Sequence, residues 1–476
     1  MFVKRFFEPS LAQASYLIGC QSAGEAIVID ANRDVEPYIQ VAAQEGLRIT
    51  HVTETHIHAD FVSGSRELAH RTGASLCLSD EGDQDWKYQF THDRKLKHGD
   101  RITIGNIRVD VLHTPGHTPE HLTFLITDGA GADKPIAAIT GDFVFVGDVG
   151  RPDLLEKAAN IKGTMEAGAR TLYRSLQTFA KQEDWLQIWP GHGAGSACGK
   201  GISAIPSSTL GYEKRFNWAF NQKSEAHFVN EVLAGQPEPP TYFAKMKRVN
   251  KEGPVLLGEF DMPPRLDPSK LADLLKRKAL VIDSRPITDY ASGHVAGTIN
   301  IPFDSSFVNW AGWLVQTDEF YVIVDAATAN ARLGELARAL ALIGIDRVSG
   351  YFDASEIKGS ATVPQVTPSQ LQTKLSNVTV VDVRSANEWS DGHLPGATHI
   401  PLGYLIDRLD EIPAGKPVVV QCRSGGRSSI AASILERAGF RDVTNLAGGL
   451  NAWTASGLTI QSQRAESARQ GPEEAA

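Results

Sequence analysis

The second half of the chain repeats itself, and this repeat limits the possible folds more than any other feature. Asp283-Ser284-Arg285 recurs as Asp382-Val383-Arg384, and Gly293-His294-Val295-Ala296-Gly297 recurs as Gly392-His393-Leu394-Pro395-Gly396. Both pairs of segments lie 99 positions apart. A unit of that length is a small domain rather than a solenoid repeat. Each copy begins as strand, turn and helix and continues with a buried strand, which predicts two successive α/β domains with parallel sheets.

Length and composition restrict the remaining possibilities. A chain of 476 residues is too long for one hydrophobic core, and three domains are the natural expectation. The formal net charge of -9 argues against a nucleic-acid partner. No run approaches the ~18 apolar residues of a membrane span, so no membrane association is expected. The four cysteines form no CxxC pair, which favours free thiols in a reducing cytoplasm. We further expect a homo-oligomer, either a dimer or a tetramer.

The first half alternates short apolar runs with helical patterns. Strands are predicted at 16–18, 26–30, 49–52, 107–112, 122–126 and 136–139, and helices at 36–45 and 64–71. The proline-rich stretch 237–240 opens a polar segment that reaches Pro264 and is the best candidate linker. The predicted parts are a first domain at 1–245, a linker at 246–264, repeated domains at 265–360 and 364–460, and a disordered tail at 461–476.

Four polar loops follow predicted strands of the first half. They contain His56-Ile57-His58-Ala59-Asp60, Gly116-His117, Gly141-Asp142 and Gly191-His192. Glycine beside the polar residue lets a loop turn sharply and present the side chain. Imidazole and carboxylate groups are ligands suited to zinc, iron or manganese. A lone histidine in a loop is normally solvated or locally hydrogen-bonded, so the series as a whole carries the metal-site prediction.

The order and spacing of these loops resemble the metallo-β-lactamase superfamily over about the first half of the chain. The resemblance implies an αββα sandwich. In that superfamily the first motif is His-x-His-x-Asp-His, whereas Phe61 replaces its last histidine here. The missing imidazole would bind a second metal ion, so Phe61 argues against hydrolysis by two zinc ions.

The remaining pattern resembles the persulfide dioxygenase branch of the superfamily. The resemblance implies that His56, His117 and Asp142 hold a single Fe(II), which leaves open positions for O2 and substrate. It further implies that His58, Asp60 and His192 orient these ligands by hydrogen bonding. The segment Gly147 to Asp153 also resembles this branch and is expected to hold the loop after Asp142.

Cys198 follows His192 by only six positions. Its thiol could face the iron pocket and take part in catalysis by handling a sulfur intermediate. A small buried side chain without chemical function is an equally good interpretation.

A second reactive loop lies in the last repeat. A buried strand at 416–421 leads into the glycine-rich loop from Cys422 to Arg427, and a helix is predicted at 428–438. Backbone N–H groups at a helix N-terminus, with Arg427 adjacent, stabilise a thiolate or a persulfide on Cys422. Cysteine phosphatases have five residues between the cysteine and the arginine of such a loop, whereas rhodanese sulfurtransferases have four, as here.

The segments 391–397 and 447–453 are also similar to rhodanese, and the resemblance spans roughly 364–457. It implies Cys422 and Arg427 as catalytic residues. The expected substrate-binding residues are Arg423, Ser424, Gly425 and Gly426.

The first repeat lacks the nucleophile. Its strand at 321–325 is followed by Ala326 where the cysteine is expected, or by a close neighbour if the loop shifts. No cysteine occurs between Cys198 and Cys422. This unit cannot run a cysteine persulfide cycle. It is expected to be a spacer, a docking surface or a wall of a substrate channel.

As a whole the chain resembles fusions of a persulfide dioxygenase with two rhodanese units. The resemblance implies one Fe(II) per chain and oxidation of a thiol persulfide by O2 to sulfite and free thiol. The thiol carrier is glutathione, cysteine or coenzyme A, and Cys422 moves sulfane sulfur with thiosulfate formed or used. Two alternatives stay open: a glyoxalase-II-like zinc thioester hydrolase, and a non-catalytic persulfide carrier or sensor.

Overall fold

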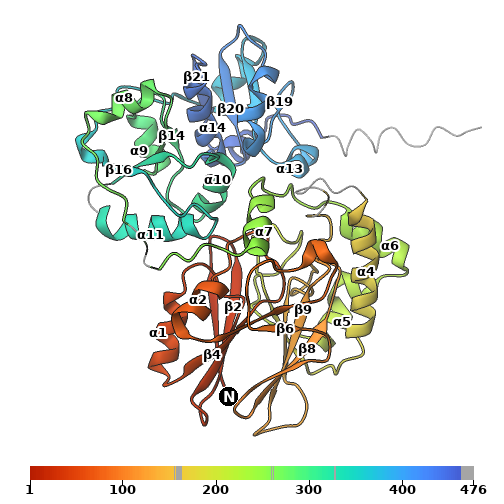
Figure 1. The fold of residues 1–476 in the computed structure, drawn as a ribbon. Helices are drawn as coiled ribbons and strands as arrows, with labels where there is room; N and C mark the ends of the chain where they lie inside the picture. Colours follow the sequence, from red (N-terminus) through yellow and green to blue (C-terminus); the bar gives the residue numbers. More distant parts are fainter. Residues whose placement is uncertain (155, 157–162, 259, 261, 326–328, 463–476) are drawn as a thin grey trace, which may run out of the picture. The chain divides into compact units, whose positions relative to one another are not determined.

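The computed structural model describes residues 1–154, 156, 163–258, 260, 262–325 and 329–462 (Figure 1). The chain divides into two compact units. Unit 1 comprises Met1–Phe260 and Arg338–Asp346, and unit 2 comprises Asp261–Ala337 and Arg347–Ala476. Unit 2 therefore contains most of the first repeat and all of the second.

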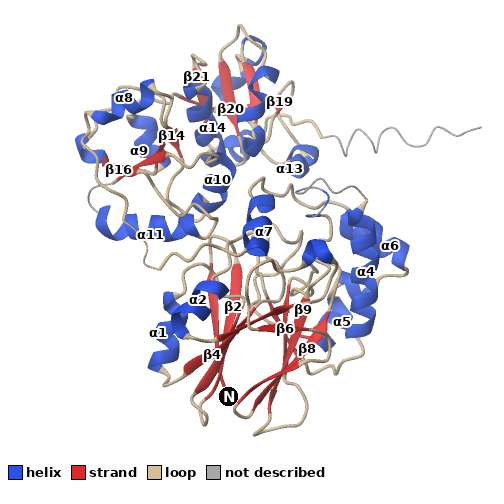
Figure 2. Ribbon diagram, in the orientation of Figure 1, coloured by secondary structure: helices blue, strands red, loops and turns tan. Residues whose placement is uncertain are grey.

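Unit 1 is built on two six-stranded sheets that face each other (Figure 2). The first sheet has the order β1-β2-β3-β4-β5-β6, with β1 Phe2–Glu8, β2 Gln13–Cys20, β3 Glu25–Ile29, β4 Arg48–Thr53, β5 Ser75–Ser79 and β6 Arg94–Leu96. The second has the order β12-β11-β10-β9-β8-β7, with β7 Arg101–Ile104, β8 Ile107–His113, β9 Leu122–Asp128, β10 Ala137–Gly141, β11 Gln187–Pro190 and β12 Ser208–Thr209.

The alternation of side chains along these strands builds three apolar layers. Phe124 and Ile126 on β9 point between the sheets and pack with Ile18 of β2, while Leu125 points to the opposite face. Each fully buried aliphatic or aromatic side chain contributes roughly 1.5 to 3 kcal/mol by leaving water. The core between the sheets therefore fixes the sheet edges that carry the polar loops.

Helices cover the outer faces of both sheets (Figure 2). The described helices of unit 1 include α1 Glu36–Gln44, α2 Ser65–Thr72, α4 Thr164–Phe179, α5 Leu210–Phe216, α6 Glu225–Leu233 and α7 Phe243–Glu252. Tyr38 and Leu68 bring α1 and α2 onto the first sheet, and Leu172 and Phe228 bring α4 and α6 onto the second. The predicted αββα sandwich is confirmed.

Helix α7 occupies the beginning of the segment that the polar composition suggested as a linker, 246–264. Met246 and Asn250 of this helix are buried. The Asn250 Nδ2 group donates to His58 O at 2.8 Å and to Phe61 O at 2.7 Å. A polar residue in the predicted linker thus satisfies buried backbone groups of the loop 56–61, which follows β4.

Unit 2 contains two parallel sheets, as the repeat predicts. The first has the order β14-β13-β15-β16, with β13 Leu280–Asp283, β14 Ile299–Asn300, β15 Phe320–Val324 and β16 Gly350–Asp353. The second has the order β17-β21-β20-β18-β19, with β17 Gln365–Val366, β18 Thr379–Asp382, β19 Thr398–His399, β20 Val418–Gln421 and β21 Val443–Leu446. Every ladder in both sheets is parallel.

One helix of the second repeat, α14, packs on the first repeat of unit 2. The described helices of the two repeats are α8 Lys270–Lys276, α9 Ile287–Ser292, α10 Phe307–Leu314, α11 Ala329–Ala341, α12 Pro368–Gln372, α13 Ala386–Asp391, α14 Gly426–Arg437 and α15 Gly449–Ala455. The end of α11, residues 338–341, belongs to unit 1. Ser433 Oγ on α14 accepts the Asn300 N–H at 3.0 Å. His294 Nε2 lies 2.7 Å from Glu436 Oε2. Of the predicted tail, Gln461 exchanges backbone hydrogen bonds with His393, and 463–476 lie outside the described residues.

The hydrogen-bond register identifies the counterpart of Cys422 in the first repeat. The Val383 N–H donates to Gln421 O, and the Ser284 N–H donates to Ile323 O in the same way. The residue after Ile323 is Val324, which is buried. Val324 therefore stands where Cys422 stands in the second repeat, whereas the predicted position, Ala326, lies outside the described residues. A valine cannot form a persulfide.

Within the described residues, no helix is both long enough and apolar enough to span a bilayer.

Candidate functional site

Three of the predicted ligands come together at one edge of the sandwich in unit 1. His56 follows β4, His117 follows β8, and Asp142 follows β10. One ligand atom of each lies within 4.8 Å of the others, and all three side chains are buried. Nε2 of His56 is 3.9 Å from Asp142 Oδ2, and Nε2 of His117 is 3.6 Å from the same oxygen. Such spacing fits three atoms that share one cation.

Hydrogen bonds orient both imidazoles toward this point. Thr55 Oγ1 donates to Asp30 Oδ2 at 2.9 Å and lies 2.9 Å from His56 Nδ1. His117 Nδ1 donates to the Arg151 carbonyl oxygen at 2.8 Å. Since each Nδ1 is engaged elsewhere, each Nε2 keeps its lone pair for the site.

The two carboxylate oxygens of Asp142 have different surroundings. Oδ1 accepts a hydrogen bond from His192 Nδ1 at 2.7 Å. Oδ2 is buried and has no hydrogen-bond partner among the described residues. Burial alone would raise the pKa of Asp142, but the charge of His192 and its hydrogen bond hold this pKa well below its usual value.

This charge distribution fits a bound cation. Burial lowers the pKa of both His56 and His117, so the two imidazoles are neutral donors beside an ionised carboxylate. A buried, unpaired carboxylate oxygen costs free energy unless a cation or a donor completes it. Two imidazoles and one carboxylate form a donor set suited to Fe(II) or Zn(II).

The loop after Asp142 packs directly on the ligands. A Cβ atom on Gly150 would lie 1.8 Å from Asp142 O and 3.2 Å from His117 Cγ, so only glycine fits there. The buried Arg151 forks onto Asp153 with contacts of 2.7 and 2.8 Å. These contacts agree with the structural role expected for the segment Gly147 to Asp153.

The remaining polar residues of the motif, His58, Asp60 and His192, form two separate sets of contacts. His192 lies beside the ligands and bridges Asp142 and Asp60, with Nε2 2.8 Å from Asp60 Oδ2. Burial alone would lower the pKa of His192, but the two carboxylates raise it well above its usual value. His58 instead turns to Asp30, with Nε2 3.1 Å from Oδ1. Burial opposes the charged form of His58, yet Asp30 raises its pKa to about 9.

Cys198 lies beside this cluster, as the sequence suggested. Asp60, His192 and Cys198 each offer one ligand atom within 4.8 Å of the others. Burial, together with Asp142 and Asp60, raises the pKa of the Cys198 thiol well above its usual value. Phe61 is fully buried, and its ring centroid is 4.4 Å from that of His58.

Two residues that support the ligands were not predicted. Asp30 accepts from the Thr55 backbone at 2.6 Å as well as from its hydroxyl, and so anchors the start of the His-x-His loop. His121 Nε2 accepts the Asp142 N–H at 3.2 Å, and its ring stacks 5.0 Å from that of His56. Asp30 shares with the predicted ligands its place at the end of a strand, which is a signal available in the sequence.

The thiol loop of unit 2 connects β20 to α14. Cys422 is buried, and its Sγ atom accepts from the Gly425 N–H at 3.1 Å and from the Ser428 hydroxyl at 3.3 Å. The loop backbone is held from behind, because the Leu450 N–H donates to Cys422 O at 2.8 Å. A Cβ on Gly449 would lie 2.3 Å from the same oxygen. The sulfur is therefore surrounded by donors that suit a negatively charged sulfur atom.

Arg427 is already paired. Its NH1 and NH2 groups donate to the two carboxylate oxygens of Glu388 at 2.6 and 2.7 Å. Burial alone would raise the pKa of Glu388, but Arg427 and the Ser385 N–H lower it to about 2. An anionic substrate that pairs with Arg427 has to compete with Glu388.

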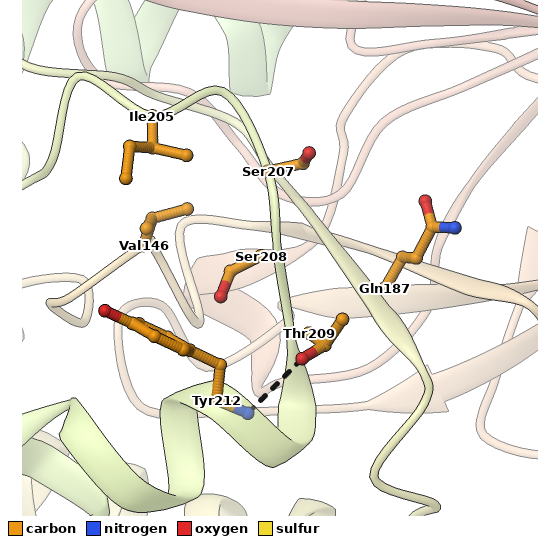
Figure 3. Close-up of a pocket in the computed structure, with 7 residues that line it drawn as sticks. All are labelled: Val146, Gln187, Ile205, Ser207, Ser208, Thr209 and Tyr212. Carbon is orange, nitrogen blue, oxygen red and sulfur yellow. Dashed lines mark hydrogen bonds between the residues drawn. The ribbon is translucent and has the colours of Figure 1, made fainter.

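A pocket of about 460 Å³ lies elsewhere in unit 1, beside β12 and α5 (Figure 3). The Thr209 hydroxyl caps α5 by accepting the Tyr212 N–H at 3.3 Å. Neither the metal ligands nor the thiol loop contributes to its lining, so this pocket is separate from both sites.

Comparisons with known proteins give the same division of the chain. The family model of the metallo-beta-lactamase superfamily matches residues 10–192. The model of the rhodanese-like domain matches twice, at 267–362 and 367–456. The crystal structure of a metallo-beta-lactamase from Staphylococcus aureus subsp. aureus COL is 45% identical, with a TM-score of 0.66, and the match covers 74% of this chain and 98% of that one.

Two curated relatives match separate parts of the chain. The mitochondrial persulfide dioxygenase ETHE1 of Homo sapiens is 29% identical over 195 residues, which are 40% of this chain and 68% of that protein. A sulfurtransferase of Allochromatium vinosum is 39% identical over 92 residues, which are 19% of this chain and 86% of that protein. The chain belongs to the metallo-beta-lactamase superfamily and has two rhodanese-like domains C-terminal to its metallo-beta-lactamase domain.

The pair of Glu388 and Arg427 predicts a pH dependence for unit 2. Because the pKa of Glu388 is lowered to about 2 in the folded chain, its pairing stabilises the fold above the unfolded pKa of about 4.3 and is lost as the pH falls toward 2. In Glu388→Gln the capping box with Ser385 can persist, because glutamine also serves there. We expect this variant to lose less thermal stability than the wild type between pH 5 and about pH 2.5, measured by scanning calorimetry.

The matched control is Glu335→Gln, which alters an exposed glutamate of unit 2. It should leave the pH profile unchanged. Equal acid sensitivity of Glu388→Gln and the wild type would contradict the ion pair.

Proposed function

We propose that the chain oxidises a low-molecular-weight thiol persulfide with O2 and couples this reaction to sulfane-sulfur transfer through Cys422. The first reaction is RSSH + O2 + H2O → RSH + SO3²⁻ + 2H⁺, in which the terminal sulfur is oxidised and O2 is reduced. The main support is the buried Asp142 Oδ2, which has no hydrogen-bond partner in the described part of the chain and faces two neutral imidazoles. The similarity to a persulfide dioxygenase supports the substrate class.

His56, His117 and Asp142 would hold one Fe(II) per chain. Bound there, Fe(II) would supply positions for O2 and for the substrate sulfur and would activate O2. Asp30, through Thr55, and the Arg151 carbonyl keep the two imidazoles oriented. The metal identity rests on the resemblance to the persulfide dioxygenase branch, since the same donors also suit zinc.

The residues around the ligands have supporting roles in this proposal. His192 fixes Asp142 through Oδ1 and is itself held by Asp60, so the carboxylate presents Oδ2 in one direction. Both ring nitrogens of His192 are engaged, which favours an orienting role over a second metal site. Cys198 lies close enough to this cluster to meet a sulfur substrate, and its participation in catalysis is part of the proposal.

Cys422 would carry the sulfane sulfur. The Gly425 N–H and the Ser428 hydroxyl stabilise negative charge on its sulfur. Attack of sulfite on a Cys422 persulfide breaks the S–S bond and yields thiosulfate and the free thiolate: Cys–S–S⁻ + SO3²⁻ → Cys–S⁻ + S2O3²⁻. The reverse reaction would use thiosulfate to supply persulfide. Arg423, Ser424, Gly425, Gly426 and Arg427 would bind the anionic partner.

A zinc thioester hydrolase is a second candidate, because Asp60, His192 and Cys198 form another group with metal-ligand spacing. Phe61 disfavours it by replacing a histidine of the family motif. A non-catalytic persulfide carrier is a third candidate and is supported by Val324 in the first repeat. The domain boundaries, the cytoplasmic location and the homo-oligomeric state stay predictions.

The dioxygenase proposal predicts oxygen uptake that depends on iron. Protein loaded anaerobically with Fe(II) should bind one iron per chain and consume O2 when glutathione, cysteine or coenzyme A persulfide is added. His117→Ala should reduce this rate by roughly 100-fold or more, because it removes a ligand. The control His70→Ala alters an exposed histidine of α2 and should retain full activity. Fully iron-loaded protein that consumes no O2, or zinc-loaded protein that cleaves thioesters instead, would refute the proposal.

The division of labour predicts separable defects. Cys422→Ser should retain oxygen uptake, since Cys422 lies in unit 2, but should accumulate sulfite in place of thiosulfate. Both ions can be followed by ion chromatography. Cys20→Ser, which alters another buried cysteine, should form thiosulfate normally. Unchanged thiosulfate formation by Cys422→Ser would show that the transfer uses another group.

A further inference from the structure

A basic pocket lies at the joint between the two rhodanese-like domains of unit 2. Its volume is about 400 Å³, within the range of small-molecule sites. The first repeat contributes most of the lining, and the second contributes Ile406 and Arg437. The pocket thus needs both domains, although only one of them carries a catalytic cysteine.

This pocket is remote from the thiol loop. Arg437 is the last residue of α14, whereas the Cys422 loop precedes the first. At 1.5 Å per residue, the helix separates the two by roughly 17 Å. On the first repeat the pocket lies near the start of β13, at Leu280, and the counterpart of Cys422, Val324, ends β15. In a parallel sheet, all strands start at one end of the sheet and finish at the other. The pocket is therefore separate from the position that corresponds to Cys422.

Positive charge gathers at this pocket although the chain as a whole carries -9. Arg277, Lys278 and Arg437 line it, and among the described lining residues Glu319 is the only one with a carboxylate. Glu319 Oε1 also accepts the Tyr321 hydroxyl at 2.7 Å. Three cations against one carboxylate leave an excess of about two positive charges, which favours an anion.

Arg437 is the strongest indication. Its guanidinium group donates to three backbone carbonyls, those of Gly297 at 2.6 Å, Lys278 at 2.7 Å and Ala279 at 3.1 Å. Carbonyls satisfy its hydrogen bonds but carry no net charge, and within the described part of the chain no ion pair is formed by Arg437 or Lys278. Burial lowers the pKa of Arg437 without any opposing carboxylate. A half-buried cation without a counter-charge costs free energy that a bound anion would offset.

The lining also has an apolar part, formed by Leu280, Leu314 and Ile406. Ile406 is 42% exposed, so its side chain offers apolar surface that a bound group can contact. The occupant therefore combines negative charge with a short apolar segment.

We propose that this pocket binds a multiply charged organic anion, namely the low-molecular-weight thiol released by the enzyme or its persulfide. The anion site rests on the lining alone, and the identity of the ligand as a thiol rests on the proposed function. Glutathione would present carboxylates and coenzyme A would present phosphates. The inactive domain would then hold the sulfur carrier beside the active domain.

Calorimetric titration of the full chain with coenzyme A, glutathione and inorganic phosphate tests the proposal. The double variant Arg277→Gln/Lys278→Gln removes two exposed cations of the lining. It should weaken binding of coenzyme A or glutathione by roughly tenfold or more, because a hydrogen bond to a charged group contributes about that factor. The control Lys358→Gln/Lys374→Gln removes two exposed lysines of unit 2 outside the pocket and should bind as the wild type does.

The preferred probe identifies the source of the negative charge, carboxylate or phosphate. The proposal is overturned if neither thiol binds. It is also overturned if the pocket variant and the control bind both thiols equally well. Inorganic phosphate that binds as tightly as either thiol overturns the assignment to an organic anion. Because heat of binding is measured without O2, a failure of the dioxygenase proposal would leave this result intact and is recognised separately by oxygen uptake.

Discussion

The functional account depends on the different surroundings of the two oxygens of the Asp142 carboxylate. One oxygen accepts a hydrogen bond from His192, which also contacts Asp60. The other lies beside two imidazoles and has no hydrogen-bond partner among the residues that the structure describes. The sandwich positions this site, because His56, His117 and Asp142 each follow a strand whose position is fixed by the core between the sheets. A buried charge of this kind is tolerable when a cation completes it.

The second half of the chain shows how one fold serves two purposes after duplication. Both repeats keep the parallel sheet and the same ladder register, so the folding constraints of the sheet survived in each. Cys422 and Val324 occupy equivalent ladder positions, and this exchange removes the chemistry without disturbing the apolar packing. A domain freed from catalysis in this way can contribute surface to a neighbour, as the lining around Arg437 illustrates.

Much of the fold could be predicted from the sequence because its signals are strand periodicity, read within short windows, and a repeat found by comparing segments 99 positions apart. The glycine-flanked polar loops indicated a metal site, and the resemblance to the persulfide dioxygenase branch selected His56, His117 and Asp142 from them. The strands and this cluster agree with those predictions. The supporting contacts were not predictable in this way. Asn250 is 192 positions from the carbonyl of His58 that it binds, and Glu388 is 39 positions from Arg427. Such partners are determined by tertiary packing. From composition alone, a polar residue that becomes buried cannot be distinguished from a polar residue in a linker.

The location of the metal ion tests the central claim most directly. Anomalous diffraction at the iron absorption edge, from crystals of Fe(II)-loaded protein, would locate every iron atom independently of any activity. The account predicts one iron per chain, bound by Nε2 of His56, Nε2 of His117 and Oδ2 of Asp142. Two metal ions in the same cleft, or a single ion bound instead by Asp60, His192 and Cys198, would contradict it.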